Sequence, residues 1–82
     1  MNIDKKRGKK MEKVTVWTND FYFVKDEVDR LLAEGKAVRV GADCIGHTRA
    51  AMVEGSAMAH FKKVGVVEVE SDGWRKWYAI PK

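Results

Sequence analysis

The dipeptide Asp72-Gly73 constrains the fold of this chain most strongly, because it separates two short segments that both have strand character. These segments span residues 66–70 and 74–80, and a two-residue Asp-Gly turn joins antiparallel strands in a fixed register. The resulting strand pairs are Ser71 with Trp74, Glu70 with Arg75, Val69 with Lys76, Glu68 with Trp77 and Val67 with Tyr78. This register predicts that the core is closed by Val67, Val69, Tyr78 and Ile80, and that the solvent face carries Glu68, Glu70, Arg75 and Trp77. We therefore expect a C-terminal β-hairpin.

The first part of the chain predicts one strand and one amphipathic helix. Residues 11–18 alternate apolar and polar side chains, which is the pattern of a half-buried strand. Apolar residues then recur at helical spacing, with charged side chains on the opposite face. Two starting points are compatible with this helix, Asp20 and Lys25, and Gly35 is a natural residue for its end.

A longer helix is expected over residues 49–63, after a short extended segment at 37–40 and the stretch 42–45, which is too brief to assign alone but takes the place of a short helix in the order of elements. Thr48 is a favourable N-cap for this helix, and Gly65 is a favourable residue at its end. The apolar stripe of the helix consists of Ala50, Val53, Ala57, Phe61 and Val64. The predicted order of elements is therefore strand, helix, strand, short helix, long helix and hairpin.

Positive charge is concentrated near the N-terminus. The 82 residues include 16 Lys or Arg and 12 Asp or Glu, a net charge of +4. Residues 1–13 hold six basic and two acidic side chains and account for the whole excess, whereas residues 14–82 hold ten of each. We expect residues 1–13 to be a flexible basic arm and residues 14–82 to be one folded domain. The alternatives for the arm are a solubilising tail, or a leader ahead of an internal start at Met11.

Several classes of protein do not fit this sequence. It contains no run of about 18 apolar residues, which a membrane span requires, and no secretory h-region follows the basic N-terminus. The single cysteine, Cys44, fits a reducing compartment, so we expect an intracellular protein of the cytoplasm or nucleoid, or of the nucleus in a eukaryote. A domain of 9.3 kDa favours binding over catalysis, and we expect no enzyme and no cofactor.

The residues with metal-binding or nucleophilic chemistry do not form a recognisable site. Cys44 and His47 have a legitimate pair spacing for zinc, but a structural zinc site needs four ligands. Asp43 and His60 do not supply a second clustered pair. Cys44 and His47 also lie on one short segment, and no Gly-rich phosphate loop is present. We therefore expect no metal site and no catalytic residues.

The C-terminal half of the chain resembles a family of DNA-binding domains. The stretch VRVGADCIGHTRAAMVEGSAMAHFKKVGVVEVESDGWRKWYAI, residues 38–80, resembles a winged helix-turn-helix domain. Within it, Phe61-Lys62-Lys63-Val64-Gly65-Val66-Val67-Glu68 is typical of a recognition helix that leads into its wing. The resemblance implies an α+β fold, a small winged helix-turn-helix with an N-terminal strand and a C-terminal β-hairpin wing. It also implies that helix 49–63 enters the major groove and that wing 66–80 contacts the backbone or the minor groove.

The distribution of side chains supplies the candidate DNA contacts. Residues 46–82 hold six basic and four acidic side chains, so the half that resembles a DNA reader is the positive one. At the hairpin tip, Trp74 beside two cations suits packing on sugar-phosphate or stacking on an unpaired base, although Trp74 could instead fold onto the core or onto Trp17. The predicted DNA-binding residues are Arg49, Met52, Ser56, Lys62, Lys63, Trp74, Arg75 and Lys76. The predicted non-specific phosphate contacts in the arm are Lys5, Lys6, Arg7, Lys9 and Lys10.

These observations favour a protein that binds double-stranded DNA, a transcriptional regulator that acts as a homodimer. A single module of this size buries too little surface to bind tightly alone, and a dimer doubles the interface. One alternative is a protein-interaction module on the same fold, in which Trp17, Trp74 and Trp77 offer apolar surface to a protein partner. A second alternative is an RNA-binding protein, because basic arms and exposed aromatic side chains suit single strands.

Overall fold

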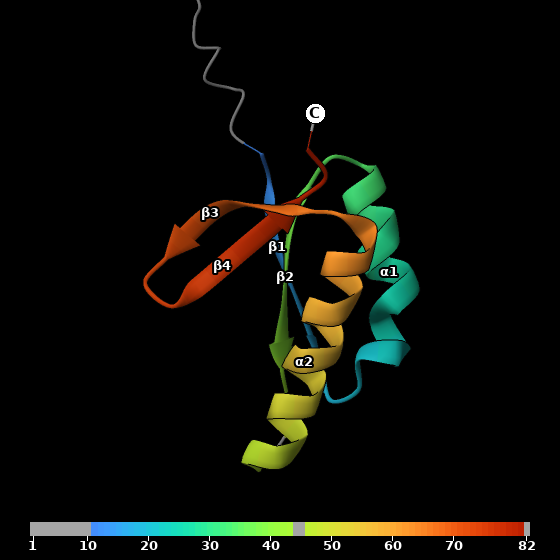
Figure 1. Ribbon diagram of the computed structural model, residues 1–82, viewed down its shortest axis with the longest axis vertical. Helices are drawn as coiled ribbons and strands as arrows, with labels where there is room; N and C mark the ends of the chain where they lie inside the picture. The colour runs from blue at the N-terminus through green and yellow to red at the C-terminus, as the bar shows by residue number, and fades with distance from the viewer. Residues whose placement is uncertain (1–10, 44–45, 82) are drawn as a thin grey trace, which may run out of the picture.

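The computed structural model describes residues 11–43 and 46–81, which form a four-stranded β-sheet with two α-helices packed on one face (Figure 1). The elements follow one another as β1 (Lys13–Thr18), α1 (Phe21–Ala33), β2 (Ala37–Ala42), α2 (His47–Val64), β3 (Val67–Asp72) and β4 (Arg75–Ala79). The predicted strand at 11–18, the helix after it, the long helix and the hairpin are all confirmed. The α+β class is therefore confirmed as well.

Strand β2 is central to the sheet, whose strand order is β1-β2-β4-β3. Strands β1 and β2 are parallel and paired along their whole length, from Lys13 opposite Ala37 to Thr18 opposite Ala42. Parallel neighbours require a crossover connection, and α1 provides it. The hairpin joins the other side of β2 by a single antiparallel pair, Val38 opposite Tyr78, so most of the hairpin extends away from β2 (Figure 1).

The hydrophobic core lies between the sheet and the two helices. The buried apolar residues of this layer are Val16, Phe21, Val28, Leu31, Leu32, Val38, Val40, Val53, Ala57 and Phe61. Val28 of α1 and Val38 of β2 are the largest side chains that are fully buried in the described part of the chain. Both helices therefore cover the same face of the sheet, and within residues 11–43 and 46–81 the other face carries no helix.

The two helices begin in different ways. The Oγ1 atom of Thr18 donates to the carbonyl oxygen of Asp20 and accepts from its amide nitrogen, and Asp20 in turn caps α1 through Tyr22 N at 3.0 Å. The earlier of the two predicted starts of this helix is thus confirmed. The prediction of Thr48 as the N-cap of the long helix is wrong, because α2 already begins at His47 and Gly46 occupies the cap without a side-chain hydrogen bond.

The predicted hairpin register is wrong: Ser71 and Glu70 pair two residues further along β4 than expected, and Glu68 and Val67 pair one residue further. Asp72 pairs with Arg75, so the two-residue loop is Gly73-Trp74 rather than Asp72-Gly73. Gly73 has φ 66°, and it takes the first loop position, where a type I′ or II′ turn needs a positive φ. An offset of two residues leaves each side chain on the same face of its strand, so the displaced loop does not by itself exchange the two faces of β4.

The burial of the hairpin side chains also differs from the prediction. Trp77, expected to face solvent, is only 6% exposed, whereas three residues expected in the core are exposed, namely Val67, Val69 and Ile80. Of the four predicted core residues of the hairpin, only Tyr78 packs there, with its ring centre 5.2 Å from that of Phe61. A bulge between Glu68 and Glu70 changes the offset between the two strands by one residue.

The winged helix-turn-helix arrangement is not confirmed. Of the short helix expected at residues 42–45, Ala42 belongs to β2 and Asp43 is not helical, while residues 44–45 lie outside the described part. Val38, Val40 and Ala42 all pack on the core, and this two-residue spacing is that of a strand rather than of a helix. Residues 1–10 of the predicted arm also lie outside the described part, and Lys13 belongs to β1.

Candidate nucleic-acid interface

Helix α2 presents one face to solvent. It packs on the sheet through Val53, Ala57 and Phe61, which are buried. Of the residues predicted to contact DNA, those of α2 lie away from this stripe: Arg49, Met52, Lys62 and Lys63 are exposed and Ser56 is half-buried. The solvent face of α2 is therefore accessible along the length of the helix.

A groove separates α2 from the N-terminal end of α1. Arg49, Met52 and Ser56 line it together with residues 19–22, and Arg49 Nη1 donates to the carbonyl oxygen of Asn19 at 3.5 Å. A second groove lies further along the same side of α2, and Lys63 lines it together with Lys25 of α1. Four of the predicted contacts thus belong to the α1 side of α2.

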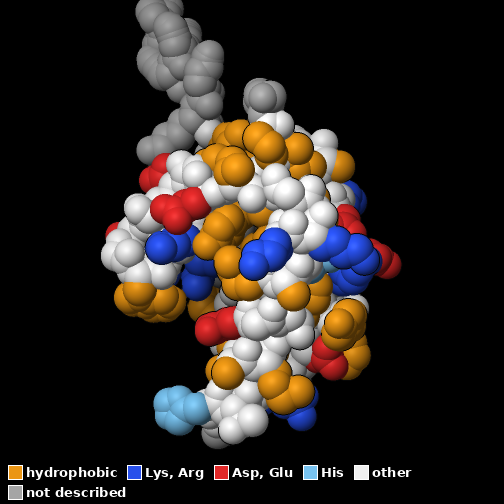
Figure 2. All heavy atoms as spheres, viewed as in Figure 1, with side chains coloured by type: hydrophobic (Ala, Val, Ile, Leu, Met, Phe, Trp, Pro, Cys, Tyr) orange, Lys and Arg blue, Asp and Glu red, His pale blue; other side chains and the backbone are white. Residues whose placement is uncertain are grey.

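A cleft of about 190 Å³ lies on the other side of α2, between this helix and the hairpin. Figure 2 shows the hollow with hydrophobic side chains inside it and Lys and Arg side chains around it. Three basic residues line the cleft, Arg39, Arg75 and Lys76, and Glu54 is the acidic residue among its lining. Trp74 also lines it, and Lys62 lies in an adjoining groove whose apolar lining includes Met58 and Tyr78.

The two basic residues of the hairpin tip each have an acidic neighbour. Arg75 Nη2 lies 2.6 Å from Asp72 Oδ2, and Lys76 Nζ lies 3.7 Å from Glu68 Oε1. All four side chains are well exposed, and exposed ion pairs contribute only about 0–1 kcal/mol. A phosphate can therefore replace the carboxylate partner of Arg75 or of Lys76 at small energetic cost.

The most distinctive cluster was anticipated only in part, by the alternative contact between Trp74 and Trp17, and it extends from the hairpin cleft to the outward face of β1. The guanidinium carbon of Arg39 in β2 lies 5.2 Å from the ring centre of Trp17, 5.6 Å from that of Trp74 and 5.7 Å from that of Trp77. We call these four residues the tryptophan cluster. The available signal was that Arg39 interrupts a buried strand, between Val38 and Val40, and so had to point away from the core.

Arg39 is held by aromatic faces rather than by a carboxylate of the described residues. Burial in the cluster, and then the positive charge of Arg75, lower the pKa of Arg39 below its ordinary value, while Glu54 acts in the opposite direction. Its Nε atom is buried without a hydrogen-bond partner, and so is Nε1 of Trp77. The cluster is therefore a positively charged site whose local charge favours an anionic partner.

The structure brings the predicted contacts together in part. Arg49, Met52, Ser56 and Lys63 lie on the α1 side of α2, whereas Trp74, Arg75 and Lys76 lie at the cleft on its other side. Trp74 does not fold onto the core, because 78% of it is exposed. The idea that Trp77 offers surface to a protein partner is wrong, because Trp77 is buried. The predicted arm contacts Lys5, Lys6, Arg7, Lys9 and Lys10 lie outside the described residues.

The residues considered for metal binding are not gathered at one place. Within residues 11–43 and 46–81, no group of three His, Cys, Asp or Glu side chains is arranged to hold a metal ion. Nε2 of His60 lies 2.6 Å from Oδ1 of Asp29, a contact that joins α2 to α1. Asp43 and His47 are exposed, and Cys44 lies outside the described residues.

Two further findings bear on the class of protein. Neither α1 nor α2 has the length and apolar character needed to cross a membrane. No family model, curated protein or solved structure matches this chain.

Proposed function

We propose that this protein binds double-stranded DNA and acts as a transcriptional regulator. In this proposal α2 enters the major groove, and the β3–β4 hairpin contacts the backbone or the minor groove in the manner of the wing of a winged-helix domain. One observation supports it above the others. The exposed face of α2 has basic side chains on both of its sides, at the α1 groove and at the hairpin cleft (Figure 2).

The dimensions of α2 suit a DNA groove. Its 18 residues span about 27 Å, and an α-helix with its side chains is about 10–12 Å wide, close to the width of the major groove. Gly55 and Ala59 are exposed on this helix, and such small residues allow a close approach to base edges. Arg49 and Ser56 are the side chains suited to hydrogen bonds with those edges.

The positions of the cations suit the phosphates on either side of a groove. Lys63, with Lys25, is placed for one strand, while Arg75 and Lys76 at the hairpin are placed for the other. Phosphate contacts of this kind fix orientation and carry most of the non-specific affinity. Because few side chains of α2 are suited to hydrogen bonds with base edges, we expect modest sequence specificity.

A homodimer is part of the proposal. One domain of this size offers a small interface, whereas specific protein–DNA interfaces usually bury about 1,000–2,500 Å² of protein surface. Two copies on a two-fold site would double the contact area and the number of phosphates neutralised. The basic arm, residues 1–13, would add non-specific affinity.

The proposal is tested by removing the cations at the C-terminal end of α2 and those at the hairpin tip in turn. We expect the double variants Lys62→Ala/Lys63→Ala and Arg75→Ala/Lys76→Ala to bind a labelled 20-base-pair duplex more weakly, measured by fluorescence anisotropy over a salt series. Each pair should lower the slope of log K against log[salt] by about two units, because each lost phosphate contact removes about 0.9.

A control variant separates the effect of where a cation lies from the effect of losing a positive charge. Arg30→Ala removes one exposed cation of α1 that lies at neither the cleft nor the α2 groove, and it should leave the slope unchanged. Binding that is equal in both double variants and in the wild-type chain would contradict the proposed interface. So would an Arg30→Ala variant that loses as much affinity as they do.

A further inference from the structure

The helix-free face of the sheet carries an exposed aromatic platform at Trp17. Trp17 stands opposite Gly41 in the β1–β2 pair, and a Cβ atom on Gly41 would lie 2.6 Å from Cζ3 of the Trp17 ring. The ring therefore covers the backbone of β2 at close range, which only glycine permits. Although it is supported in this way, Trp17 remains 57% exposed. It offers a ring in a fixed position to solvent.

A second platform lies across Arg39 from the first. Trp74 at the hairpin tip is the most exposed of the three tryptophans, and its ring centre lies 5.6 Å from the guanidinium of Arg39. Because the Trp17 ring lies 5.2 Å from the same carbon, the two ring centres are separated by no more than about 11 Å. Successive nucleotides of a strand rise about 3.4 Å when stacked and more when splayed, so two or three nucleotides span this distance.

Charge at the centre of the patch identifies the kind of occupant. Arg39 lies between the two platforms, with buried Trp77 beside it and the Arg75 guanidinium close enough to repel it. Among the described residues, Arg39 contacts aromatic faces. Its planar guanidinium can therefore still donate hydrogen bonds to an anionic partner. Stacking surfaces on either side of a cation match a chain of alternating bases and phosphates.

We propose that Trp17, Arg39 and Trp74 form a binding site for single-stranded DNA, in which one base stacks on each exposed ring and Arg39 holds a phosphate between them. The site deepens the proposed function and rests on it only in assigning a DNA ligand to this chain. It extends from the hairpin cleft, which Arg39 and Trp74 line, to Trp17 on the outward face of β1, whereas the duplex is assigned to α2 and the cations beside it. An unpaired segment beside a duplex would engage both surfaces.

The test uses the full-length chain and a labelled 12-nucleotide oligo(dT), which has no secondary structure, with fluorescence anisotropy as the readout. Trp17→Leu keeps an apolar cover over Gly41 but removes the stacking ring, and Trp74→Ala removes a side chain that is almost free of packing. We expect each to weaken oligo(dT) binding by about five- to 150-fold, the usual loss for one stacking aromatic. Arg39→Gln should also lower the salt slope by about 0.7, the loss of one phosphate contact on a single strand.

The matched control is Phe23→Ala. Phe23 of α1 is as exposed as Trp74, at 78%, but it lies outside the tryptophan cluster. This variant should bind oligo(dT) as the wild-type chain does. Unchanged oligo(dT) binding in both Trp17→Leu and Trp74→Ala, with circular dichroism confirming that they are folded, would overturn the proposal. An equal loss in Phe23→Ala would do the same.

The same variants separate this inference from the proposed function. If the inference is right, Trp17→Leu loses oligo(dT) affinity and keeps duplex affinity, while Lys62→Ala/Lys63→Ala does the reverse. A wild-type chain that binds the duplex but not oligo(dT) overturns the inference and leaves the proposed function standing. A wild-type chain that binds oligo(dT) but not the duplex overturns the proposed function and leaves the inference standing. More than tenfold preference for oligo(rU) over oligo(dT) would overturn the assignment to DNA.

Discussion

At the scale of single residues, two glycines show how differently the backbone uses the same side chain. Gly41 is required because the Trp17 ring occupies the space that a Cβ atom would need. Gly55 lies in the middle of α2 with nothing within 4 Å of where its Cβ would be. Glycine at position 55 therefore has no packing advantage, and it destabilises the helix because its backbone loses more conformational entropy on folding than that of alanine.

We predict that Gly55→Ala stabilises the protein by about 0.5–1 kcal/mol, because alanine restricts the unfolded chain and meets no neighbour in the folded one. Urea unfolding followed by circular dichroism measures the free energy of unfolding. Gly65→Ala is the matched control. Its φ is 91°, so the same substitution there should destabilise. A loss of stability in Gly55→Ala would contradict the exposure of this face of α2.

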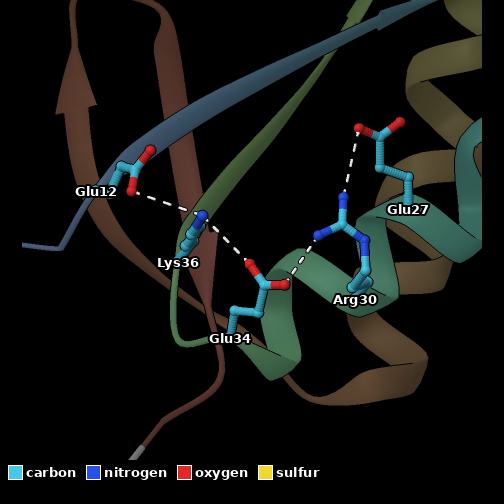
Figure 3. A network of polar contacts seen from close by, with 5 residues as sticks. All are labelled: Glu12, Glu27, Arg30, Glu34 and Lys36. Carbon is cyan, nitrogen blue, oxygen red and sulfur yellow. Dashed lines mark hydrogen bonds and ion pairs between the residues drawn. The ribbon is translucent and has the colours of Figure 1, made fainter.

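At the scale of elements, an ion-pair chain fastens the end of α1 to the segment that follows it and to the segment before β1 (Figure 3). Arg30 lies between Glu27 and Glu34, at 3.9 Å and 2.8 Å. Lys36 then bridges Glu34 at 3.2 Å and Glu12 at 3.6 Å. The hydrogen bond from Lys36, and then that from Arg30, lower the pKa of Glu34 below its ordinary value.

This pKa shift predicts a pH-dependent contribution to stability. Because the folded state lowers the pKa of Glu34, the contribution is complete above the ordinary value of 4.5 and is lost as the pH falls through the lowered value. Glu34→Gln should therefore reduce the melting temperature slightly at pH 7, and the difference from the wild-type chain should close below pH 4.5. Thermal melts at several pH values measure it. A difference that is the same at pH 7 and pH 3 would contradict this account.

The elements that the sequence predicted correctly are those whose signals are local. Helical spacing and the cap at Asp20 define α1, and the glycine in the turn defines the hairpin. The register of the hairpin was missed because Gly73 fits either of two adjacent loop positions, and the choice depends on where Trp77 finds packing partners. Lys13 of β1 supplies one, with its Nζ 4.6 Å from the Trp77 ring centre, and that contact is not local.

The candidate site shows the same division. The exposed residues of α2 and the cations at the hairpin tip could be predicted from the sequence, because helix faces and turn tips follow from spacing. The tryptophan cluster was predicted only in part. A contact of Trp74 with Trp17 was one of the alternatives, but the position of Arg39 between them was not foreseen, because the cluster joins three different elements of the chain. Parallel pairing of β1 with β2 brings Trp17 beside Arg39, and parallel partners leave no short-range signal in a sequence.

At the scale of the whole molecule, the arrangement of charge matters more than its sum. Residues 14–82 carry as many acidic as basic side chains, so an attraction to DNA must come from where the cations lie. Basic residues flank α2 on both sides, and Arg39 lies in the tryptophan cluster, while acidic residues pair with the cations at the end of α1. In the two proposals, one small domain thus presents one surface to a duplex and a second surface to an unpaired strand.

The measurement that tests the central claim most directly compares residues 1–82 with residues 11–82 for binding to the 20-base-pair duplex over a salt series. The account predicts that both chains bind and that log K falls with log[salt] by several units in each, because the folded domain itself contacts phosphates. Residues 1–82 should bind more tightly, since they include the basic arm. Binding by residues 1–82 alone would place the affinity in the arm and contradict a DNA-binding role for α2 and the hairpin.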